Sequence, residues 1–450
     1  MSRIPSRCIL VSFAFALASC AMHIEGEQQE RDLANKLGTA YASPFAERAL
    51  PPLQPDASHA QWLAHAEAKN GALEAAFREW TAAIEDVPQM ATQDTTAMLG
   101  VEHTLDGGAA LDRTGLMLMT DTMANWAFPG RMRDRALTAL MRAKAAGLEF
   151  VEARLRLQAD VADRYVALAL LDRQRELQSK LVATLRVARD SANARFSAGA
   201  ATQRELLAAE SESRRAAAEL ARLDAERPMR VAALRAIANV SAEDCADAKP
   251  QLPAFAPLRD EEAAEIERAL THNASTLASK ARHDAALQAI TEAEWERIPQ
   301  FSLRTLLMGD GSAMIQPAFT LPFLRSHAID ARLRQAEAEA GAALALLRQA
   351  EADATAEAVA QKQAIAAATA QHAILASEVA PLLAQSATIA RSEWSVGSGM
   401  LADWIEAESA QIALDVELAQ LCAEAAIARA HLQHALGRAA AEGPADAPLR

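Results

Sequence analysis

The feature that most constrains this 450-residue chain is an internal duplication. Residues 195–211, RFSAGAATQRELLAAES, align without a gap on residues 393–409, EWSVGSGMLADWIEAES. The aromatic residues, serines and glycines match in order, and the same register still holds at Leu234 and Leu432. Because such self-similarity means that one supersecondary unit is used twice, we expect two copies of a helix, a short β segment, a long helix, a turn and a second long helix.

Each copy contains an unusually long helical stretch. There is no proline between Gly130 and Gly199, and apolar residues recur there at helical spacing. About 65 residues at roughly 1.5 Å each give a rod on the order of 100 Å. The matching stretch of the second copy, about residues 325–395, contains Pro381, which removes a backbone donor and should kink or break the helix. Pro228 should do the same on the return helix of the first copy.

The composition favours closely packed helices. Hydrophobic residues make up 51% of the chain but aromatic residues only 4%, and alanine supplies much of the difference. Alanine is the best helix former and lets helix axes approach closely. We therefore expect a mainly α fold with a small β part, of the coiled-coil or helical-barrel type.

The N-terminus has the layout of a secretory signal peptide. Arg3 and Arg7 precede an apolar run over residues 9–18, which is too short to span a membrane permanently. The run ends in the sequence LASC at Cys20. This sequence resembles the bacterial lipobox, in which a signal peptidase cuts before the cysteine and the thiol then carries diacylglycerol. We expect lipidation of Cys20; the alternative is a plain signal peptide with a chance cysteine.

Cysteine usage and charge exclude several classes of function. Cys245 and Cys422 are the cysteines outside the N-terminal region, and they provide neither a disulfide framework nor metal-ligand spacing. The formal charge is −14, which argues against duplex nucleic acid as a partner. The sequence shows no nucleophile–base pair or phosphate loop. We therefore expect no enzyme activity and no cofactor.

Proline content and the duplication together suggest the domain boundaries. Four prolines between residues 44 and 55 favour an extended arm. The helical hairpins should cover residues 130–240 and 325–438, with their tips at Gly199 and Gly397. The expected order is a lipoprotein signal peptide over 1–19, a lipidated extended arm over 20–59, a first repeat over 60–240, a linker over 241–262, a second repeat over 263–438 and a disordered tail over 439–450.

Short strands are expected in both copies, at about residues 97–127 and 301–321. The candidates are 97–105 and 115–127 in the first copy and 301–308 and 313–321 in the second. A membrane strand needs about 9 to 11 residues with outward apolar alternation. The second pair is barely long enough and is interrupted by Pro317, and the alternation of the first pair is poor. A thin or degenerate barrel is an alternative, in which the lipid on Cys20 would hold most of the attachment.

Taken together, these features resemble the outer membrane efflux protein (TolC) family over about residues 60–438. The resemblance implies a homotrimer in the outer membrane of a Gram-negative bacterium, with a transmembrane β-barrel and a long periplasmic α-barrel. It further implies the exit duct of a tripartite efflux or type I secretion system, which passes small molecules or ions passively and works with a periplasmic adaptor and an inner-membrane pump. The alternative is a lipid-anchored periplasmic coiled-coil protein, structural or adaptor-like, without a pore.

The twin turns carry the most specific part of this resemblance. A helix that reverses tightly needs a residue that adopts positive φ, and glycine does so without steric cost. Gly399 is expected to act as a second hinge. In the family such turns are periplasmic tips where the adaptor docks, which assigns docking to Ser197, Gly199, Ser395, Val396 and Gly397.

Acidic residues follow each turn. Asp403 and Glu406 stand three apart, hence on one helix face, and match positions where the family narrows the periplasmic entrance. Three-fold symmetry would turn them into rings of carboxylates, which repel one another and attract cations. Glu205 is the weaker equivalent in the first copy. The alternative for all three is a solvated helix face.

Two groups of residues raise the question of metal binding. Met117, Met119 and Met123 could suggest soft-metal handling, although methionine more often fills gaps in apolar packing. His431 and His434 lie three apart on a helix, but without a carboxylate or cysteine partner a solvated pair is favoured over a zinc site. We therefore expect no metal site.

Overall fold

The computed structural model describes residues 22–48, 50–92, 96–103, 114–121, 129–243, 245, 247–258, 273–308 and 313–437. Cys20, the expected signal peptide and the expected tail over 439–450 lie outside these residues. The chain divides into two compact units. Unit 1 comprises Met1–Thr39, Ala76–Phe150 and Ser275–Ala350, and unit 2 comprises Ala40–Ala75, Val151–Ala274 and Glu351–Arg450.

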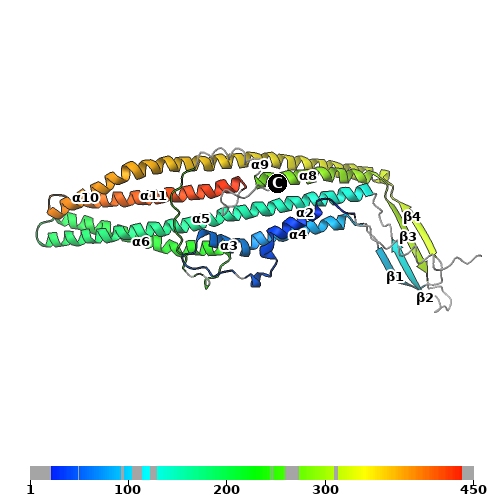
Figure 1. Ribbon diagram of the computed structural model, residues 1–450, viewed down its shortest axis with the longest axis horizontal. Coiled ribbons are helices and arrows are strands. Elements are labelled where there is room, and N and C mark those ends of the chain that lie inside the picture. Colours follow the sequence, from blue (N-terminus) through cyan, green and yellow to red (C-terminus); the bar gives the residue numbers. More distant parts are fainter. Residues whose placement is uncertain are drawn as a thin grey trace, which may run out of the picture. The chain divides into compact units, whose positions relative to one another are not determined.

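The fold is mainly α with a small β part, as the sequence predicts (Figure 1). The helices in chain order are α2 (Glu27–Leu37), α3 (His59–Lys69), α4 (Gly71–Met90), α5 (Pro129–Ser197), α6 (Gln203–Ala238), α8 (Ala274–Glu294), α9 (Ser326–Ile374), α10 (Ala380–Val396) and α11 (Leu401–Ala435). Short 3₁₀ turns occur at Thr39–Tyr41, Phe45–Glu47, Trp295–Arg297 and Pro322–Arg325.

The long helices agree with most of the expectations drawn from the positions of proline. Helix α5 is unbroken over 69 residues. In the second copy a π-helical turn, η6 (Leu375–Val379), interrupts the helix just before Pro381, where the missing N–H removes a regular hydrogen bond. Helix α6 runs through Pro228 without a break, so of the kink or break expected there the break is absent. Next to it, Arg227 holds α6 to α5 through Asp172, with an Nε–Oδ1 distance of 2.6 Å.

The N-terminal arm is not extended throughout, which corrects the expectation for residues 20–59. Residues Glu27–Leu37 form α2, with acidic side chains in the first turn and Lys36 in the last, as the helix dipole favours. Arg31 of this helix binds the carboxylate of Glu85 on α4 at 2.5 and 3.1 Å. The prolines of the arm begin only at residue 44, after the helix has ended, and therefore do not oppose it.

The strands form one antiparallel sheet in the order β1-β2-β3-β4. Strands β1 (Thr96–His103) and β2 (Thr114–Asp121) come from the first copy, and β3 (Phe301–Met308) and β4 (Ala313–Phe319) come from the second. Pairing of β2 with β3 joins the two copies. Strand β3 has the expected bounds of 301–308, and β4 ends at Phe319, before the expected end at residue 321.

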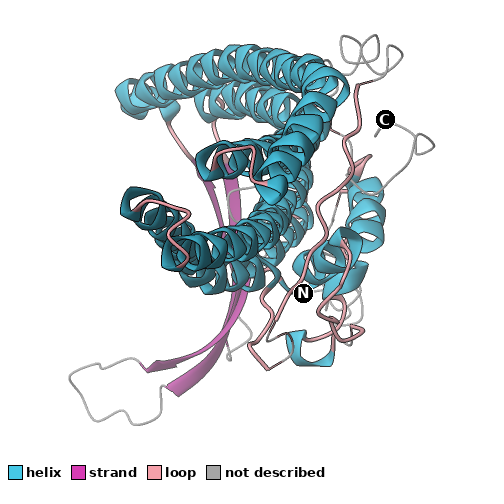
Figure 2. Ribbon diagram, turned by 90° about the vertical axis from the view of Figure 1, so that its left-hand side faces the viewer, coloured by secondary structure: helices cyan, strands magenta, loops and turns pink. Residues whose placement is uncertain are grey.

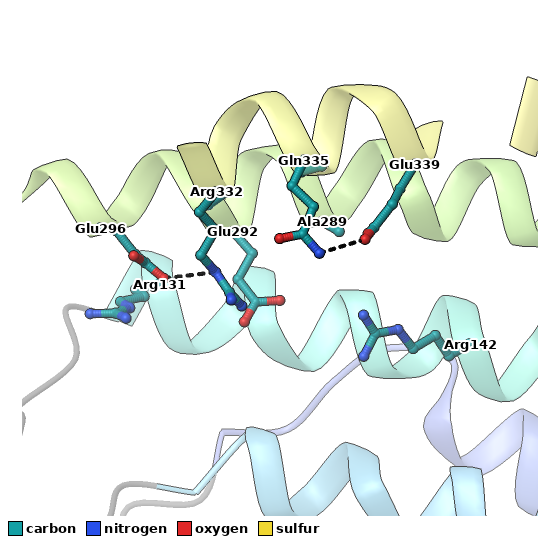
Figure 3. A pocket seen from close by; sticks show the side chains of 10 residues that line it. Arg131, Arg142, Ala289, Glu292, Glu296, Arg332, Gln335 and Glu339 are labelled. Carbon is teal, nitrogen blue, oxygen red and sulfur yellow. Dashed lines mark hydrogen bonds and ion pairs between the residues drawn. The ribbon is translucent and has the colours of Figure 1, made fainter. Parts of the chain in front are cut away.

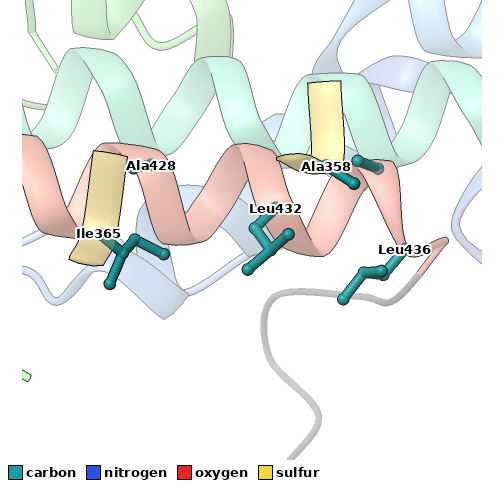
Figure 4. Close-up of a cluster of buried hydrophobic side chains, with 6 residues drawn as sticks. Ala358, Ile365, Ala428, Leu432 and Leu436 are labelled. Carbon is teal, nitrogen blue, oxygen red and sulfur yellow. The ribbon is translucent and has the colours of Figure 1, made fainter. Parts of the chain in front are cut away.

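Each unit has its own core. In unit 1 the rings of Trp80 on α4 and Phe150 on α5 stack with centroids 5.8 Å apart, and Trp80 is fully buried. In unit 2, Ile365 of α9 packs against Leu432 of α11 beside small alanines (Figure 4). Alanine at these contacts lets the helix axes approach closely, as the composition suggests.

A pair of asparagines shows that the duplication extends to the end of each hairpin. The side-chain amide of Asn70 donates to the carbonyl of Ile237 at 3.0 Å, and that of Asn273 donates to the carbonyl of Ala435 at 2.7 Å. Ile237 and Ala435 have the same separation along the chain as the two turn glycines. The same hydrogen bond therefore closes the end of the return helix in both copies.

Candidate functional site

The two turns have the same backbone conformation. The first turn, residues 198–202, joins α5 to α6, and the second turn, residues 397–400, joins α10 to α11. Gly199 has φ of 72° and Gly397 has φ of 79°. A Cβ atom built on either glycine would meet no atom within 4 Å. Glycine is therefore required by the left-handed conformation and not by lack of space.

Hydrogen bonds confirm that both turns are the same helix-ending motif. Each glycine N–H donates to the carbonyl three residues earlier, at 3.0 Å for Gly199 and 3.1 Å for Gly397. The N–H of the following residue donates to the carbonyl five residues earlier, at 2.8 Å for Ala200 and 3.0 Å for Ser398. These two bonds define a Schellman motif, which satisfies the last carbonyls of α5 and α10.

Gly399 has a different role from the hinge expected of it. Its φ is not positive, and a Cβ atom there would lie 2.9 Å from Cβ of Glu393 and 3.2 Å from the carbonyl carbon of that residue. Its N–H donates to the Glu393 carbonyl at 3.1 Å. Gly399 is therefore needed because two stretches of backbone approach closely.

The two turns lie side by side, and Figure 2 shows the molecule from this end. The guanidinium of Arg195 lies over the ring of Trp394, with Cζ 4.1 Å from the ring centroid. Beneath this pair, all four helices contribute to one buried cluster. Its members are Ala188, Ala192, Ala209, Leu401 and Trp404, with Leu206, Ala390, Trp394 and Ile405 packed against them. The structure thus places the two turns that were predicted from the sequence in a single site.

The predicted docking residues are exposed at this end. Val396 is 75% exposed, and Met400, which sequence reasoning did not single out, is 67% exposed. Ser197 and Ser395 are exposed too, but each hydroxyl donates to a carbonyl of its own helix. The apolar side chains and the glycine backbone are therefore the parts of the turns that are open to a partner.

Glu205 acts as a helix cap. Its carboxylate accepts a hydrogen bond from the backbone N–H of Thr202 at 3.2 Å, and its own N–H donates to the Thr202 hydroxyl at 3.3 Å. This reciprocal pair is a capping box, which satisfies free donors at the start of α6. The carboxylate that the sequence suggested for the entrance is thus already engaged within its own copy.

Asp403 and Glu406 are unpaired in the second copy. Met400 occupies the N-cap position of α11 and offers no side-chain acceptor. Both carboxylates are exposed, and within the described part of the chain neither forms an ion pair or a side-chain hydrogen bond. Trp404 between them is buried, which fixes the helix face that carries the two acids. Two free carboxylates therefore stand beside the second turn.

The structure corrects one argument made about the histidines that were considered for metal binding. His431 has a carboxylate partner after all, because its Nε2 lies 3.0 Å from Oδ2 of Asp163 on α5. Burial lowers the pKa of His434. Within the described residues, no group of three or more histidine, cysteine, aspartate or glutamate side chains could hold a metal ion.

A small polar cavity lies in unit 1, with a volume of about 180 Å³ (Figure 3). Its wall carries arginines and glutamates from the start of α5, from α8 and its 3₁₀ extension, and from α9. Arg332 Nε pairs with Glu296 Oε1 at 2.9 Å, and Gln335 donates to Glu339 at 2.8 Å. The Arg332–Glu296 pair joins α9 to the 3₁₀ extension of α8 at this cavity, which is therefore a polar joint between helices.

Comparison with solved structures identifies the fold. No protein-family model and no curated protein sequence matches the chain. The outer membrane protein VceC from Vibrio cholerae has a TM-score of 0.73 at 20% identity, covering 84% of this chain and 96% of that one. The CmeC outer membrane channel from Campylobacter jejuni has a TM-score of 0.72 at 17% identity, covering 90% and 91%.

A third structure agrees with these two. The open state of the MtrE outer membrane channel from Neisseria gonorrhoeae has a TM-score of 0.70 at 18% identity, covering 84% of this chain and 89% of that one. In all three cases most of both chains superposes. The resemblance drawn from the sequence is confirmed at the level of the fold: the chain has the fold of the outer membrane efflux (TolC) family.

Proposed function

We propose that the chain is one subunit of the exit duct of a tripartite efflux or type I secretion system in the outer membrane of a Gram-negative bacterium. The duct would pass small molecules or ions passively from the periplasm to the exterior. The observation that carries the proposal is the meeting of both turns in one exposed end beside two free carboxylates, within an outer-membrane channel fold. Catalysis has no part in this role.

The sheet supports assembly into a trimer. Among the described strands, β1 pairs only with β2 and β4 only with β3, so the sheet has two open edges. Open edges are normally paired or covered. Three copies joined edge to edge would close twelve strands into a barrel, which leaves no open edge.

The helices support the same assembly. Leu346, Val359, Ile374, Leu382 and Ile389 lie along α9 and α10, and each is at least 48% exposed. An 18-residue window of the stretch Pro322–Val396 has a mean hydropathy of 1.4, and only 6% of it is buried within the chain. By length and composition alone, this stretch could cross a membrane. In the proposed trimer a neighbouring subunit would cover these apolar residues instead.

The exposed end of unit 2 is the proposed docking site for a periplasmic adaptor, which would connect the duct to an inner-membrane pump. Val396 and Met400 supply exposed apolar contact, and the Gly199 and Gly397 turns supply accessible backbone. A few residues usually carry most of the affinity at a protein interface, and these two exposed side chains are the candidates in the turns. Three subunits would present three such ends to the adaptor.

Asp403 and Glu406 are the proposed entrance acids. In a trimer they would form two rings of three carboxylates, six in all, that attract cations and hold the entrance narrow. Glu205 would contribute less, since its carboxylate caps α6. Lipidation of Cys20 would add an anchor in the outer membrane, and a triacylated cysteine holds more firmly than a single acyl chain.

Two measurements test the duct. Light scattering on detergent-extracted protein should give a trimer, and the same sample should conduct ions in planar bilayers. A trimer that fails to conduct under any voltage would favour the alternative, a coiled-coil protein without a pore. A monomer without conductance would remove the proposal.

A further inference from the structure

An exposed apolar surface lies where the sheet of unit 1 passes into a long helix. The 3₁₀ turn η5 (Pro322–Arg325) follows β4 and leads directly into α9 (Figure 1). Phe323 is 70% exposed and Leu324 is 73% exposed, and Leu321 just before the turn is 52% exposed. We call Leu321, Phe323 and Leu324 the apolar patch. Large apolar side chains gathered on an open surface mark a place that meets a partner or a membrane.

Hydrogen bonds tie this turn to the sheet. The N–H of Leu324 donates to the Leu321 carbonyl at 3.1 Å, and Pro322 fixes φ at the start of the turn. The N–H of Thr320 donates to the Gln300 carbonyl at 2.9 Å, and the N–H of Gln300 donates to the Thr320 hydroxyl at 2.7 Å. These bonds join the residue after β4 to the residue before β3. The apolar patch is therefore presented by a turn with a defined backbone.

The charge that is free beside the apolar patch is positive. Arg325, the last residue of the turn, is exposed, and among the described residues it has neither an ion pair nor a side-chain hydrogen bond. The sequence has no acidic residue from 321 to 329. The first acid of α9 is Asp330, whose carboxylate already accepts a hydrogen bond from Arg297 at 3.1 Å. The patch thus has a cationic edge.

An apolar surface with a cationic edge fits a membrane with anionic headgroups. Apolar side chains enter the boundary between headgroups and acyl chains, and binding grows with the buried apolar area and with attraction to anionic lipid. The long stem of an arginine lets its charged group stay at the level of the headgroups. The exposed apolar surface also continues onto the sheet, because Phe319 at the end of β4 is 66% exposed. A lipid partner explains this continuity and the free charge together.

We propose that the apolar patch and Arg325 bind anionic phospholipid of the periplasmic leaflet of the outer membrane. The patch lies among the upper acyl chains, and the guanidinium lies at the phosphate. This inference rests on the proposed function, because a duct whose strands span the outer membrane brings the turn after β4 to that leaflet. A trimer carries three such contacts around the base of the barrel. They fix the depth of the duct in the bilayer, as interfacial anchors do.

Quenching by brominated lipid tests the contact. Cys245 and Cys422 are first replaced by alanine, and the protein without an introduced cysteine gives the background of a thiol-reactive bimane label. Leu324→Cys then carries the label in trimers reconstituted into phosphatidylcholine and phosphatidylglycerol that are brominated high on the acyl chains. Bromine should lower its fluorescence about twofold or more, because the patch lies among those chains. Leu346→Cys is the matched control.

The control position has similar exposure but a different place. Leu346 is 62% exposed and lies about 30 Å along α9 from the start of that helix. Its label should not respond to brominated lipid, because this part of α9 extends into the periplasm in the proposed duct. Quenching at 324 that does not exceed quenching at 346 would overturn the lipid contact.

Arg325→Gln tests the anionic headgroup. The label at position 324 is read in two bilayers, one with bromine only on phosphatidylglycerol and one with bromine only on phosphatidylcholine. With Arg325 present, phosphatidylglycerol should be favoured about fivefold, and Arg325→Gln should remove this preference. Arg348→Gln, an exposed arginine farther along α9, is the control and should retain it. A preference that survives Arg325→Gln would overturn the proposal.

Potassium conductance in the same bilayers separates this proposal from that of the duct. A conducting trimer whose label at 324 responds to neither bromine nor aqueous iodide has the patch under a neighbouring subunit. A conducting trimer whose label responds only to iodide has the patch in water. Either result overturns the lipid contact and leaves the duct intact, whereas a parent protein that never conducts overturns the duct. If Leu324→Cys fails to insert, Phe323→Cys carries the label and the same outcomes decide.

Discussion

The two turns are nearly identical in backbone and differ in the first residues of the helix that follows. After the first turn, Thr202 and Glu205 cap α6 with a reciprocal pair of hydrogen bonds. After the second, Met400 cannot cap α11, and Asp403 stays free. The difference shows that one acidic position can serve helix stability in one copy and leave its charge available in the other. A duplicated chain can therefore keep its fold in both copies while one copy changes its surface.

The largest expected effect concerns the charge. Replacing Asp403 and Glu406 by alanine should raise single-channel conductance and weaken block by trivalent cations by about tenfold, or ~1.4 kcal/mol. Planar-bilayer recordings measure both quantities. Glu205→Ala is the matched control in the first copy and should change the block far less, because its carboxylate is held by Thr202. Equal effects of the two changes on the block would show that the two turns do not differ in the availability of their charge.

The glycine turns should respond alike. Gly199→Ala and Gly397→Ala each force a side chain into the left-handed region, which costs about 1–2 kcal/mol. Thermal unfolding of the detergent-extracted protein should show the same loss for both. Gly341, inside α9 with open space around it, is the control, and Gly341→Ala should stabilise or leave the protein unchanged. A loss of stability at only one turn would show that the shared backbone motif is not equally important in the two copies.

Substitution of the N-cap residue should have unequal effects at the starts of α6 and α11. Thr202→Ala removes the cap of α6 and should cost about 1 kcal/mol, whereas Met400→Ala removes no capping bond. Met400→Thr with Asp403→Glu would give the second turn the capping pair of the first and should stabilise the protein. The same variant should also weaken cation block, since the new carboxylate would be engaged. Stabilisation together with unchanged block would show that the free acid at this position does not line the entrance.

The smallest effect is expected at the contact between the turns. Arg195→Ala removes the guanidinium from the Trp394 ring and should cost about 0.5–1 kcal/mol in thermal unfolding. Arg204→Ala, an exposed arginine at the start of α6, is the control and should have less effect. The two variants would be indistinguishable if the cation–π contact added nothing.

The parts of the fold that depend on local patterns could be predicted from the sequence. The unbroken α5 follows from a proline-free run with helical spacing, and both positive-φ glycines follow from the duplicated turn. The bounds of β3 were also predicted, because Pro299 and a glycine-rich sequence flank it. In these places the residues themselves determine the backbone.

The parts that depend on distant neighbours could not be predicted. Pro228 is tolerated where Arg227 ties α6 to Asp172, and His431 finds Asp163 from a position 268 residues away. The pairing of β2 with β3 could not be predicted either, because the two strands lie far apart in the sequence. The capping role of Glu205 is an exception, since Thr202 three residues before it is a recognisable signal in the sequence.

The asparagine hydrogen bonds have a consequence for how such a chain could arise. Asn70 donates to Ile237 and Asn273 donates to Ala435, so in each copy the hydrogen bond at the end of the return helix comes from a residue of the same copy. A half-length ancestor would already hold every group needed to close one helical unit. Six such half-chains could form the ring that three fused chains form in the proposed trimer, and fusion would then have freed the two halves to specialise.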